Sequence, residues 1–277
     1  MLDHTLFFDA HLAGKYNITW AEFIRSSAEK YLNRTEDIRV LDVGCGETCP
    51  ITILLTARGW RCTGIDLEPV WRISPSAALS YAAKNGGVRG IIKKLVREVT
   101  VVNRTQKSIL SMAGIKMPRT LDVQCASVSE TSFPDAEFDV ICSKAVFEHV
   151  MDMKSAVEEM YRMTKPGGIG MHWIHLFTSL SGGHDPAWAK PDTKPSKEVP
   201  PWDHLLRGRS PAMNILNHLR ERDYRSLLED HFEILEWKKD RQGEKVLTPE
   251  LRKALKDYDE DELLTYGIIA VVRKPTG

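Results

Sequence analysis

Two short apolar runs, each ending at an aspartate, constrain this chain more than any other feature. The first, VLDVGCGETCP over Val40–Pro50, carries Asp42 and follows it with Gly44 and Gly46. The second ends in Asp66, twenty-four residues after the first aspartate. Glycine lets the backbone turn sharply and approach a ligand closely. The pattern therefore predicts a strand, a glycine turn, a helix that begins at the proline, and a second strand with an acid at its tip.

The spacing of the glycines indicates which kind of ligand such a turn would hold. Adjacent parallel strands present a nucleoside site at their carboxyl ends, where Asp66 can accept hydrogen bonds from ribose hydroxyls. A dinucleotide site needs a third glycine for the pyrophosphate, and Cys49 occupies that position. The Gly-Lys-Ser/Thr of a P-loop is also absent. These absences disfavour a dinucleotide and a nucleotide phosphate. The alternative to a ligand site is a turn whose glycines serve packing alone.

Strands and helices alternate along the rest of the chain, which predicts a doubly wound, mainly parallel α/β sheet with helices on both faces. The predicted strands are Arg39–Val43, Arg61–Ile65, Leu121–Cys125, Phe138–Cys142, Ile169–Leu176, Phe232–Trp237 and Tyr266–Arg273. Helices are predicted over residues 16–32, 50–58 and 152–163. A further helix is predicted from Ser210 and Pro211, a cap followed by a first-turn proline, through an apolar stripe to Leu228.

Several segments resemble the class I S-adenosylmethionine-dependent methyltransferases. The Asp-x-Gly-x-Gly loop and the downstream acid resemble the first two motifs of that family. FPDAEFDVICSKAVFEHV resembles its fourth strand and following loop, EEMYRMTKPGGIGMHWIH its Pro-Gly-Gly turn and fifth strand, and YGIIAVVRKP its last strand. The resemblance covers roughly residues 36–68, 121–177 and 212–274. It implies a seven-stranded Rossmann-like sheet in a single domain over residues 1–277.

Two segments are longer than the usual connections between strands and helices. They span residues 68–120 and 178–210. We expect both insertions at the cofactor end of the sheet, where long loops build a substrate pocket or a lid.

The resemblance assigns residues to the cofactor, S-adenosyl-L-methionine. The implied cofactor-binding residues are Asp42, Gly44, Gly46, Asp66, Leu67, Ser127, Val128 and Ser143. The first three border the methionine part, Asp66 takes the ribose hydroxyls, and Leu67 lies beside the adenine. Ser127 and Val128 occupy the adenine position that the family often gives to an aspartate. Ser143 forms the floor of the methionine or acceptor region.

Histidines are the natural proton acceptors, since an imidazole titrates near neutral pH. The candidates for this catalytic role are His204, His184 and His175. His149 either packs and orients its loop or serves as a further candidate. His184 and His204 lie in GGHDPAW and PWDHLL, each beside an aspartate and near a tryptophan. Aromatic rings and carboxylates together suit a sugar or another polyol. The alternative is a polar surface loop that the tryptophans anchor to the domain.

The segment from Lys84 to Arg119 is strongly basic, with Glu98 as its single acid, and contains an apolar stripe at helical spacing. The stripe consists of Ile91, Ile92, Leu95, Val96, Val99 and Val102. We expect the stripe to cover the acceptor pocket and to leave Lys93, Lys94 and Arg97 at its entrance, which favours an anionic acceptor. Alternatives are a lid with a solvated basic face, and contact with an acidic membrane surface.

Composition excludes several classes of function. The 38 basic side chains balance the 38 acidic ones, and the basic segment lacks interleaved aromatic residues, so we expect no nucleic-acid partner. The five cysteines show no paired spacing and no His-x-x-x-His motif is present, so we expect no metal. The chain has no signal-peptide pattern and no apolar run of about 20 residues, which favours a reduced, cytoplasmic protein.

These observations lead to one preferred function and its rivals. We expect transfer of a methyl group to a hydroxyl of a small acceptor, because the region from GGHDPAW to RSPAMNILNHLRERDY loosely resembles methyltransferases of polysaccharide or natural-product assembly. The acceptor would be a sugar, a glycolipid or a natural product. Rivals are methylation of nitrogen or carbon in a natural product, and a partner protein that binds the cofactor without catalysis. A dehydrogenase is disfavoured by the missing third glycine.

Overall fold

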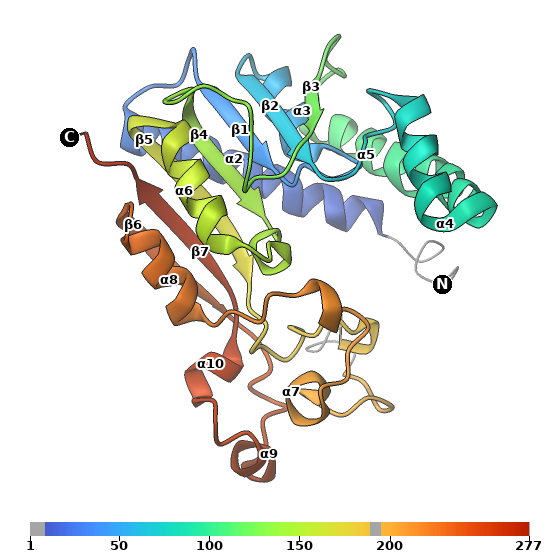
Figure 1. The fold of residues 1–277 in the computed structure, drawn as a ribbon, viewed down its shortest axis with the longest axis vertical. Coiled ribbons are helices and arrows are strands. Elements are labelled where there is room, and N and C mark those ends of the chain that lie inside the picture. Colours follow the sequence, from blue (N-terminus) through green and yellow to red (C-terminus); the bar gives the residue numbers. More distant parts are fainter. Residues whose placement is uncertain (1–8, 189–194, 277) are drawn as a thin grey trace. The chain divides into compact units, whose positions relative to one another are not determined.

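A computed structural model describes residues 9–188 and 195–276, which form an α/β fold (Figure 1). The strands are β1 Arg39–Val43, β2 Arg61–Asp66, β3 Asp122–Cys125, β4 Phe138–Lys144, β5 Thr164–His175, β6 Glu233–Arg241 and β7 Thr265–Arg273. The α-helices are α2 Ala10–Leu32, α3 Pro50–Ala57, α4 Pro75–Arg97, α5 Asn103–Ala113, α6 Met153–Met163, α7 Asp203–Arg207, α8 Glu221–Glu229, α9 Pro249–Ala254 and α10 Glu260–Leu264. Short π- and 3-10-helical segments are η1 Glu98–Val102, η2 Phe147–His149, η3 Pro186–Trp188 and η4 Met213–Ile215. Among the described residues, no helix is both long and apolar enough to cross a membrane.

The seven strands form one sheet in the order β3-β2-β1-β4-β5-β7-β6. Strands β1, β2 and β3 run parallel, with Asp42 opposite Gly64 and Asp66 opposite Cys125. Strand β6 runs antiparallel to β7. The prediction of a seven-stranded, mainly parallel sheet is therefore confirmed. The strand bounds differ from the predicted ones by at most five residues, at the start of β5.

The chain consists of two compact units. Unit 1 contains Met1–Cys142 and Arg162–Ile169, and unit 2 contains Ser143–Tyr161 and Gly170–Gly277. The single domain and the two insertions at the cofactor end stay predictions. Part of the second predicted insertion, residues 189–194, lies outside the described residues.

Unit 1 is built around β1, β2 and β3, with α2 packed against α3 and α5. Gly14 permits a close approach of α2 to α5, since a Cβ at this position would lie 3.2 Å from Ser108 Oγ. An apolar cluster packs beside the glycine loop. It comprises Cys45, Cys49, Ile53 and Val70, together with the partly buried Leu110, Met117, Leu121 and Val123. This packing fixes the loop between β1 and α3 from beneath.

Unit 2 contains β6 and β7, with α8 packed on β6. A separate apolar cluster buries part of the segment that follows β5. Its fully buried members are Leu180, Trp188, Trp202, Leu247, Leu255, Leu263 and Leu264. Trp188 and Trp202 are 3% and 0% exposed, and each indole N–H donates to a backbone carbonyl. The two tryptophans therefore anchor the segment, and neither ring has a free face to stack on a sugar.

The predicted helix start at Ser210 is wrong. The chain forms only the short η4 segment, and α8 begins eleven residues later, at Glu221. Asn217 explains the break, because its side-chain amide donates to Phe147 O at 2.7 Å and to Val150 O at 2.9 Å. His218 then adopts a left-handed conformation, with φ of 58°. Tertiary hydrogen bonds thus override the local helix-start signal.

Candidate functional site

In unit 1, the glycine loop turns between β1 and α3 in left-handed conformations. Gly44, Gly46 and Cys49 have φ values of 67°, 65° and 44°. Asp42 fastens this loop to the first turn of α3, because its Oδ2 accepts hydrogen bonds from Thr52 N at 3.1 Å and Thr52 Oγ1 at 2.7 Å. Burial raises the pKa of Asp42 to about 7, and these hydrogen bonds offset only part of that effect.

Asp66 joins the tips of β1 and β2. Its Oδ2 accepts a hydrogen bond from Gly46 N at 2.9 Å, and its Oδ1 accepts one from Glu68 N at 3.0 Å. A carboxylate oxygen accepts more than one hydrogen bond, so each oxygen retains acceptor capacity. The arrangement suits a ligand that offers two neighbouring hydroxyl groups.

A cavity of about 500 Å³ lies beside this aspartate in unit 1, within the range of small-molecule sites. Its lining residues are Ala13, Asn17, Gly46, Glu47, Thr48, Asp66, Glu68, Arg97, Val101 and Thr105. Of the predicted cofactor residues, Gly46 and Asp66 line it. The other predicted residues are not among its lining residues, namely Asp42, Gly44, Leu67, Ser127, Val128 and Ser143. Leu67 is 67% exposed, whereas Val128 is buried.

Glu47 links the glycine loop to α4. Its Oε2 lies 3.2 Å from Lys94 Nζ, and its Oε1 lies 3.2 Å from Arg97 Nε. Lys94 is buried, although it was predicted at the entrance of an acceptor pocket. The single negative charge of Glu47 offsets only one of the two positive charges of Lys94 and Arg97, so an anionic acceptor stays a prediction.

The apolar stripe of the basic segment does not form one buried face. Ile92 and Val99 are 55% and 67% exposed, whereas Val102 is buried. One irregularity changes the helical phase within the stripe. The π-helical turn η1 has a wider repeat, whereas the kink at Gly87, with φ of 55°, precedes the stripe. The positions that a regular repeat would align therefore point in different directions.

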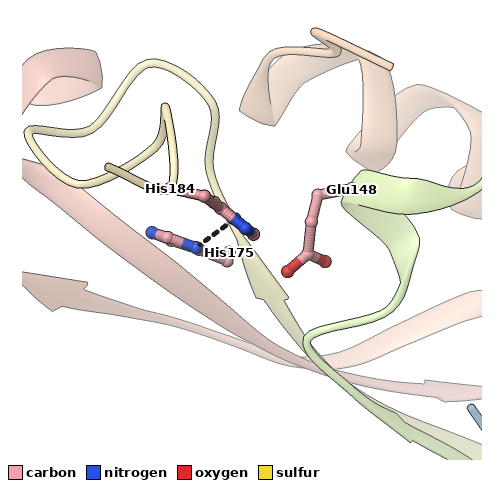
Figure 2. A group of neighbouring side chains, drawn as sticks. All are labelled: Glu148, His175 and His184. Carbon is pink, nitrogen blue, oxygen red and sulfur yellow. Dashed lines mark hydrogen bonds between the residues drawn. The ribbon is translucent and has the colours of Figure 1, made fainter. Parts of the chain in front are cut away.

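In unit 2, two of the predicted catalytic histidines meet. His175 is the last residue of β5, and His184 lies in a turn with φ of 55°. His175 Nδ1 is 2.9 Å from His184 Nε2. Figure 2 marks this hydrogen bond with a dashed line. Burial, reinforced by the neighbouring imidazoles, lowers the pKa of His175 to about 3 and that of His184 to about 4. Both rings are therefore neutral at neutral pH.

The hydroxyl groups around His175 define its tautomer. Ser179 Oγ donates to Leu176 O at 2.8 Å and lies 3.4 Å from His175 Nε2. Ser181 Oγ donates to Gln242 Oε1 at 3.0 Å and lies 3.2 Å from the same nitrogen. Because both hydroxyls donate elsewhere, they accept from His175, whose Nε2 then carries the hydrogen. The lone pair on His175 Nδ1 therefore faces His184.

Glu148 completes this cluster, and its role was missed in the sequence. It lies on η2, and its carboxylate faces the two imidazoles (Figure 2). It is 1% exposed, and burial raises its pKa to about 8. The backbone N–H groups of Glu148 and His175 favour the ionised form, but neither forms a well-aligned hydrogen bond with it. The signal available in the sequence is an acid directly after the apolar residues Ala145–Phe147.

The remaining predicted residues of unit 2 are held by packing. His204 Nε2 donates to Phe177 O at 2.8 Å, and the ring is buried against Phe177. Ser143 Oγ lies 2.9 Å from His172 Nδ1, and the His172 ring packs on Phe147. These side chains hold neighbouring segments in place, so the structure joins His175 and His184 but not His204.

Comparison with known sequences points to methyl transfer. The sequence model of a family described as a methyltransferase domain matches residues 79–171, about a third of the chain. A protein of Mycolicibacterium smegmatis, provisionally named an S-adenosylmethionine-dependent methyltransferase, is 25% identical over 125 residues, covering 45% of this chain and 44% of the relative. An uncharacterized methyltransferase of Schizosaccharomyces pombe is 27% identical over 160 residues, and the match covers 58% of this chain and 47% of the relative. The matched segments thus span about half the length of the curated relatives.

Comparison with solved structures agrees on the fold. A protein from Galdieria sulphuraria, provisionally described as a sarcosine dimethylglycine methyltransferase, superposes with a TM-score of 0.54. The two chains share 15% identity, and the match covers 94% of this chain and 86% of the other. At this identity the likeness shows the fold alone, a Rossmann-like methyltransferase sheet with helices around it.

Proposed function

We propose that this chain is a class I S-adenosylmethionine-dependent methyltransferase and that it transfers a methyl group to a hydroxyl of a small acceptor. The acceptor class is a sugar, a glycolipid or a natural product. In this proposal the cavity of unit 1, with Asp66, binds the cofactor. The observation that carries the proposal is the hydrogen bond between Gly46 and Asp66 at the edge of a ligand-sized cavity.

The residues of the cavity fit S-adenosylmethionine. No described atom lies within 4 Å of the position that a Cβ on Gly46 would take, so the glycine leaves open space at the lining. Asp66 keeps acceptor capacity for the two ribose hydroxyls. The cofactor supplies a methyl group on a positively charged sulfur. No residue of the cavity needs to bind a phosphate, which agrees with the absence of a third glycine.

A neutral imidazole suits removal of a hydroxyl proton, and His184 is our proposed proton acceptor. His175 presents a lone pair to His184 Nε2, so this nitrogen carries the hydrogen and His184 Nδ1 keeps the free lone pair. His175 then orients the second ring, as the third member of a catalytic triad does. The contacts of His204 assign it to packing, so we place it outside the proton path.

Two measurements on the full chain test the proposal. Calorimetry should show binding of S-adenosylhomocysteine and no comparable binding of NAD⁺. Turnover is then followed with a panel of small acceptors that carry a hydroxyl or an amine on the same scaffold. Methylation of the hydroxyl members alone supports the proposal. Methylation of amines alone favours the N-methyltransferase rival, and binding of NAD⁺ instead of S-adenosylhomocysteine overturns the cofactor assignment.

A further inference from the structure

We infer that Glu148, His175 and His184 form a binding site for a divalent transition-metal ion, with Zn²⁺ as the expected type. The three residues come from η2, from the end of β5 and from the turn after it. One donor atom from each lies within 4.8 Å of the other two. Figure 2 shows the carboxylate and the two rings converging on the same space.

Glu148 supplies the strongest reason to expect a cation. Its side chain is 1% exposed, and neither carboxylate oxygen accepts a hydrogen bond within the described parts of the chain. The nearby Tyr224 hydroxyl does not compensate, since it donates to Asn217 Oδ1 at 2.9 Å. A buried carboxylate without a well-aligned hydrogen bond is costly unless it is neutralised, paired or bound to a metal. A cation between Glu148 and the imidazoles would remove this cost.

The surroundings of His175 match those of a metal-binding imidazole. Ligand histidines usually donate their second ring N–H to a neighbouring acceptor, which fixes the ring and directs the other nitrogen to the ion. Here the Nε2–H of His175 faces the hydroxyls of Ser179 and Ser181, and the Nδ1 lone pair faces the cluster. Both imidazoles are neutral, the form that coordinates a metal.

The composition of the donor set selects the ion. Two histidines and one carboxylate hold zinc in many catalytic sites and leave a position open, whereas Mg²⁺ and Ca²⁺ prefer oxygen ligands. Tetrahedral bonds of about 2.0–2.2 Å place two ligand atoms roughly 3.3–3.6 Å apart. The three donors, which lie within 4.8 Å of one another, need only small shifts to reach one ion. The ion would also replace the hydrogen bond between His175 and His184. The turn that carries His184 provides the movable part.

This inference concerns binding and does not require the proposed methyl transfer. The ion and the proton from the hydroxyl of the methyl acceptor compete for the same imidazole nitrogens. If His184 is the proton acceptor, Zn²⁺ binding should lower turnover, and an ion that instead activates the acceptor should raise it. Either effect on rate is separate from the affinity measurement below.

The full chain, freed of metal with a chelator, is titrated with ZnCl₂ by calorimetry and with Co²⁺ by visible absorption. We expect one tight Zn²⁺ site, ligand-field bands of a nitrogen-bound Co²⁺, and a melting temperature that rises with Zn²⁺ but not with Mg²⁺. Glu148→Gln, which keeps the shape, and His184→Gln should each weaken Zn²⁺ binding by at least about 10–100-fold, the range for loss of supporting groups alone.

His231→Gln serves as the matched control, because His231 lies in the same unit and contacts Tyr161 instead of the cluster. This variant should bind Zn²⁺ like the unchanged protein. Circular dichroism establishes that each variant is folded. Absence of a tight site in the unchanged protein overturns the inference. Equal Zn²⁺ affinity in the unchanged protein, Glu148→Gln and His184→Gln also overturns it, because the ion would then bind elsewhere.

Discussion

Gly46 N donates a hydrogen bond of 2.9 Å to Asp66 Oδ2, which connects the loop after β1 to the tip of β2. The same carboxylate is the proposed partner of the ribose hydroxyls. Asp66→Ala should therefore weaken S-adenosylhomocysteine binding strongly, since each hydrogen bond to a charged group contributes about 1.5–3 kcal/mol. Calorimetry on the folded variant gives the loss directly.

The exposed Glu36, also in unit 1, provides a control for this measurement. Glu36→Ala should bind S-adenosylhomocysteine with unchanged affinity. Asp66→Asn separates loop support from charge, because its amide oxygen still accepts from Gly46 while the negative charge is gone. Unchanged affinity in a folded Asp66→Ala would contradict the ribose assignment.

The cysteines offer a second, independent readout of the cofactor site. Cys125 is exposed, pairs in register with Asp66 and donates to Leu67 O at 3.3 Å. The other cysteines, at positions 45, 49, 62 and 142, are buried. Burial raises the pKa of Cys62 and Cys142, which keeps them as unreactive thiols. Iodoacetamide should therefore modify Cys125 first, as mass spectrometry of peptides would show.

Saturating S-adenosylhomocysteine should slow the modification of Cys125 several-fold, because the proposed adenine position adjoins Leu67. The Asp66→Ala variant should lose this protection at the same ligand concentration. Equal rates of modification with and without ligand in the unchanged protein would place the adenine elsewhere.

The sequence was sufficient for β1, β2 and the loop between them because their signals are local. An apolar run, two glycines and a proline within Val40–Pro50 specify strand, turn and helix without help from distant residues. The helix predicted at Ser210 failed because Asn217 bonds to carbonyls near residue 147, a contact that no local pattern contains.

The cluster of Glu148, His175 and His184 was only partly predictable for a related reason. Both histidines were recognised as residue types with suitable chemistry, yet their meeting depends on the turn after β5. Glu148 stands in a run that otherwise predicts packing, and its burial appears only in the folded chain. A sequence can thus identify candidate residues for such a site without showing which of them lie close together in the fold.

Glu47 should couple the stability of α4 to that of the glycine loop. In Glu47→Gln the buried Lys94 loses its charge partner, and leaving one member of a buried pair alone is destabilising. Since Glu47 is partly exposed, we expect a loss of about 1–3 kcal/mol, below the range for fully buried pairs. Urea denaturation measures the loss, and hydrogen exchange should show faster opening of α4. The exposed pair of Lys154 with Glu158 gives a control, since Glu158→Gln should change stability little.

His184 and His204 should respond differently to substitution. His184→Ala should lower turnover by about 10²–10⁴-fold on a hydroxyl acceptor with little effect on S-adenosylhomocysteine affinity, as expected for a lost proton acceptor. His204→Ala should instead lower the melting temperature, because it removes a buried hydrogen bond to Phe177 O and leaves a cavity. Steady-state kinetics at saturating acceptor and thermal melts separate the two effects. Wild-type turnover in His184→Ala would move the proton-accepting role to another group.

Asp42 should give the chain a stability that falls as pH rises. Its pKa is about 7 in the fold, above the ordinary value of 3.8, because burial disfavours the charged carboxylate. Between these values the folded protein binds more protons than the unfolded chain. The contribution is therefore fully present below about pH 4 and is lost as pH rises toward about 7. A shift of this size corresponds to at most about 4 kcal/mol.

Asp42→Asn isolates this contribution, because the amide keeps an acceptor for Thr52 and cannot ionise. The free energy of unfolding of the variant minus that of the unchanged protein should grow between about pH 4 and about pH 8. Taking the difference removes the slopes from other buried groups such as Glu148. Asp37→Asn, at an exposed acid of the same unit, should show a nearly constant difference. If urea denaturation shows that the Asp42→Asn difference in unfolding free energy is also constant with pH, then Asp42 is ionised in the fold throughout this range. The hydrogen bonds from Thr52 would then fully offset the cost of burying its charge.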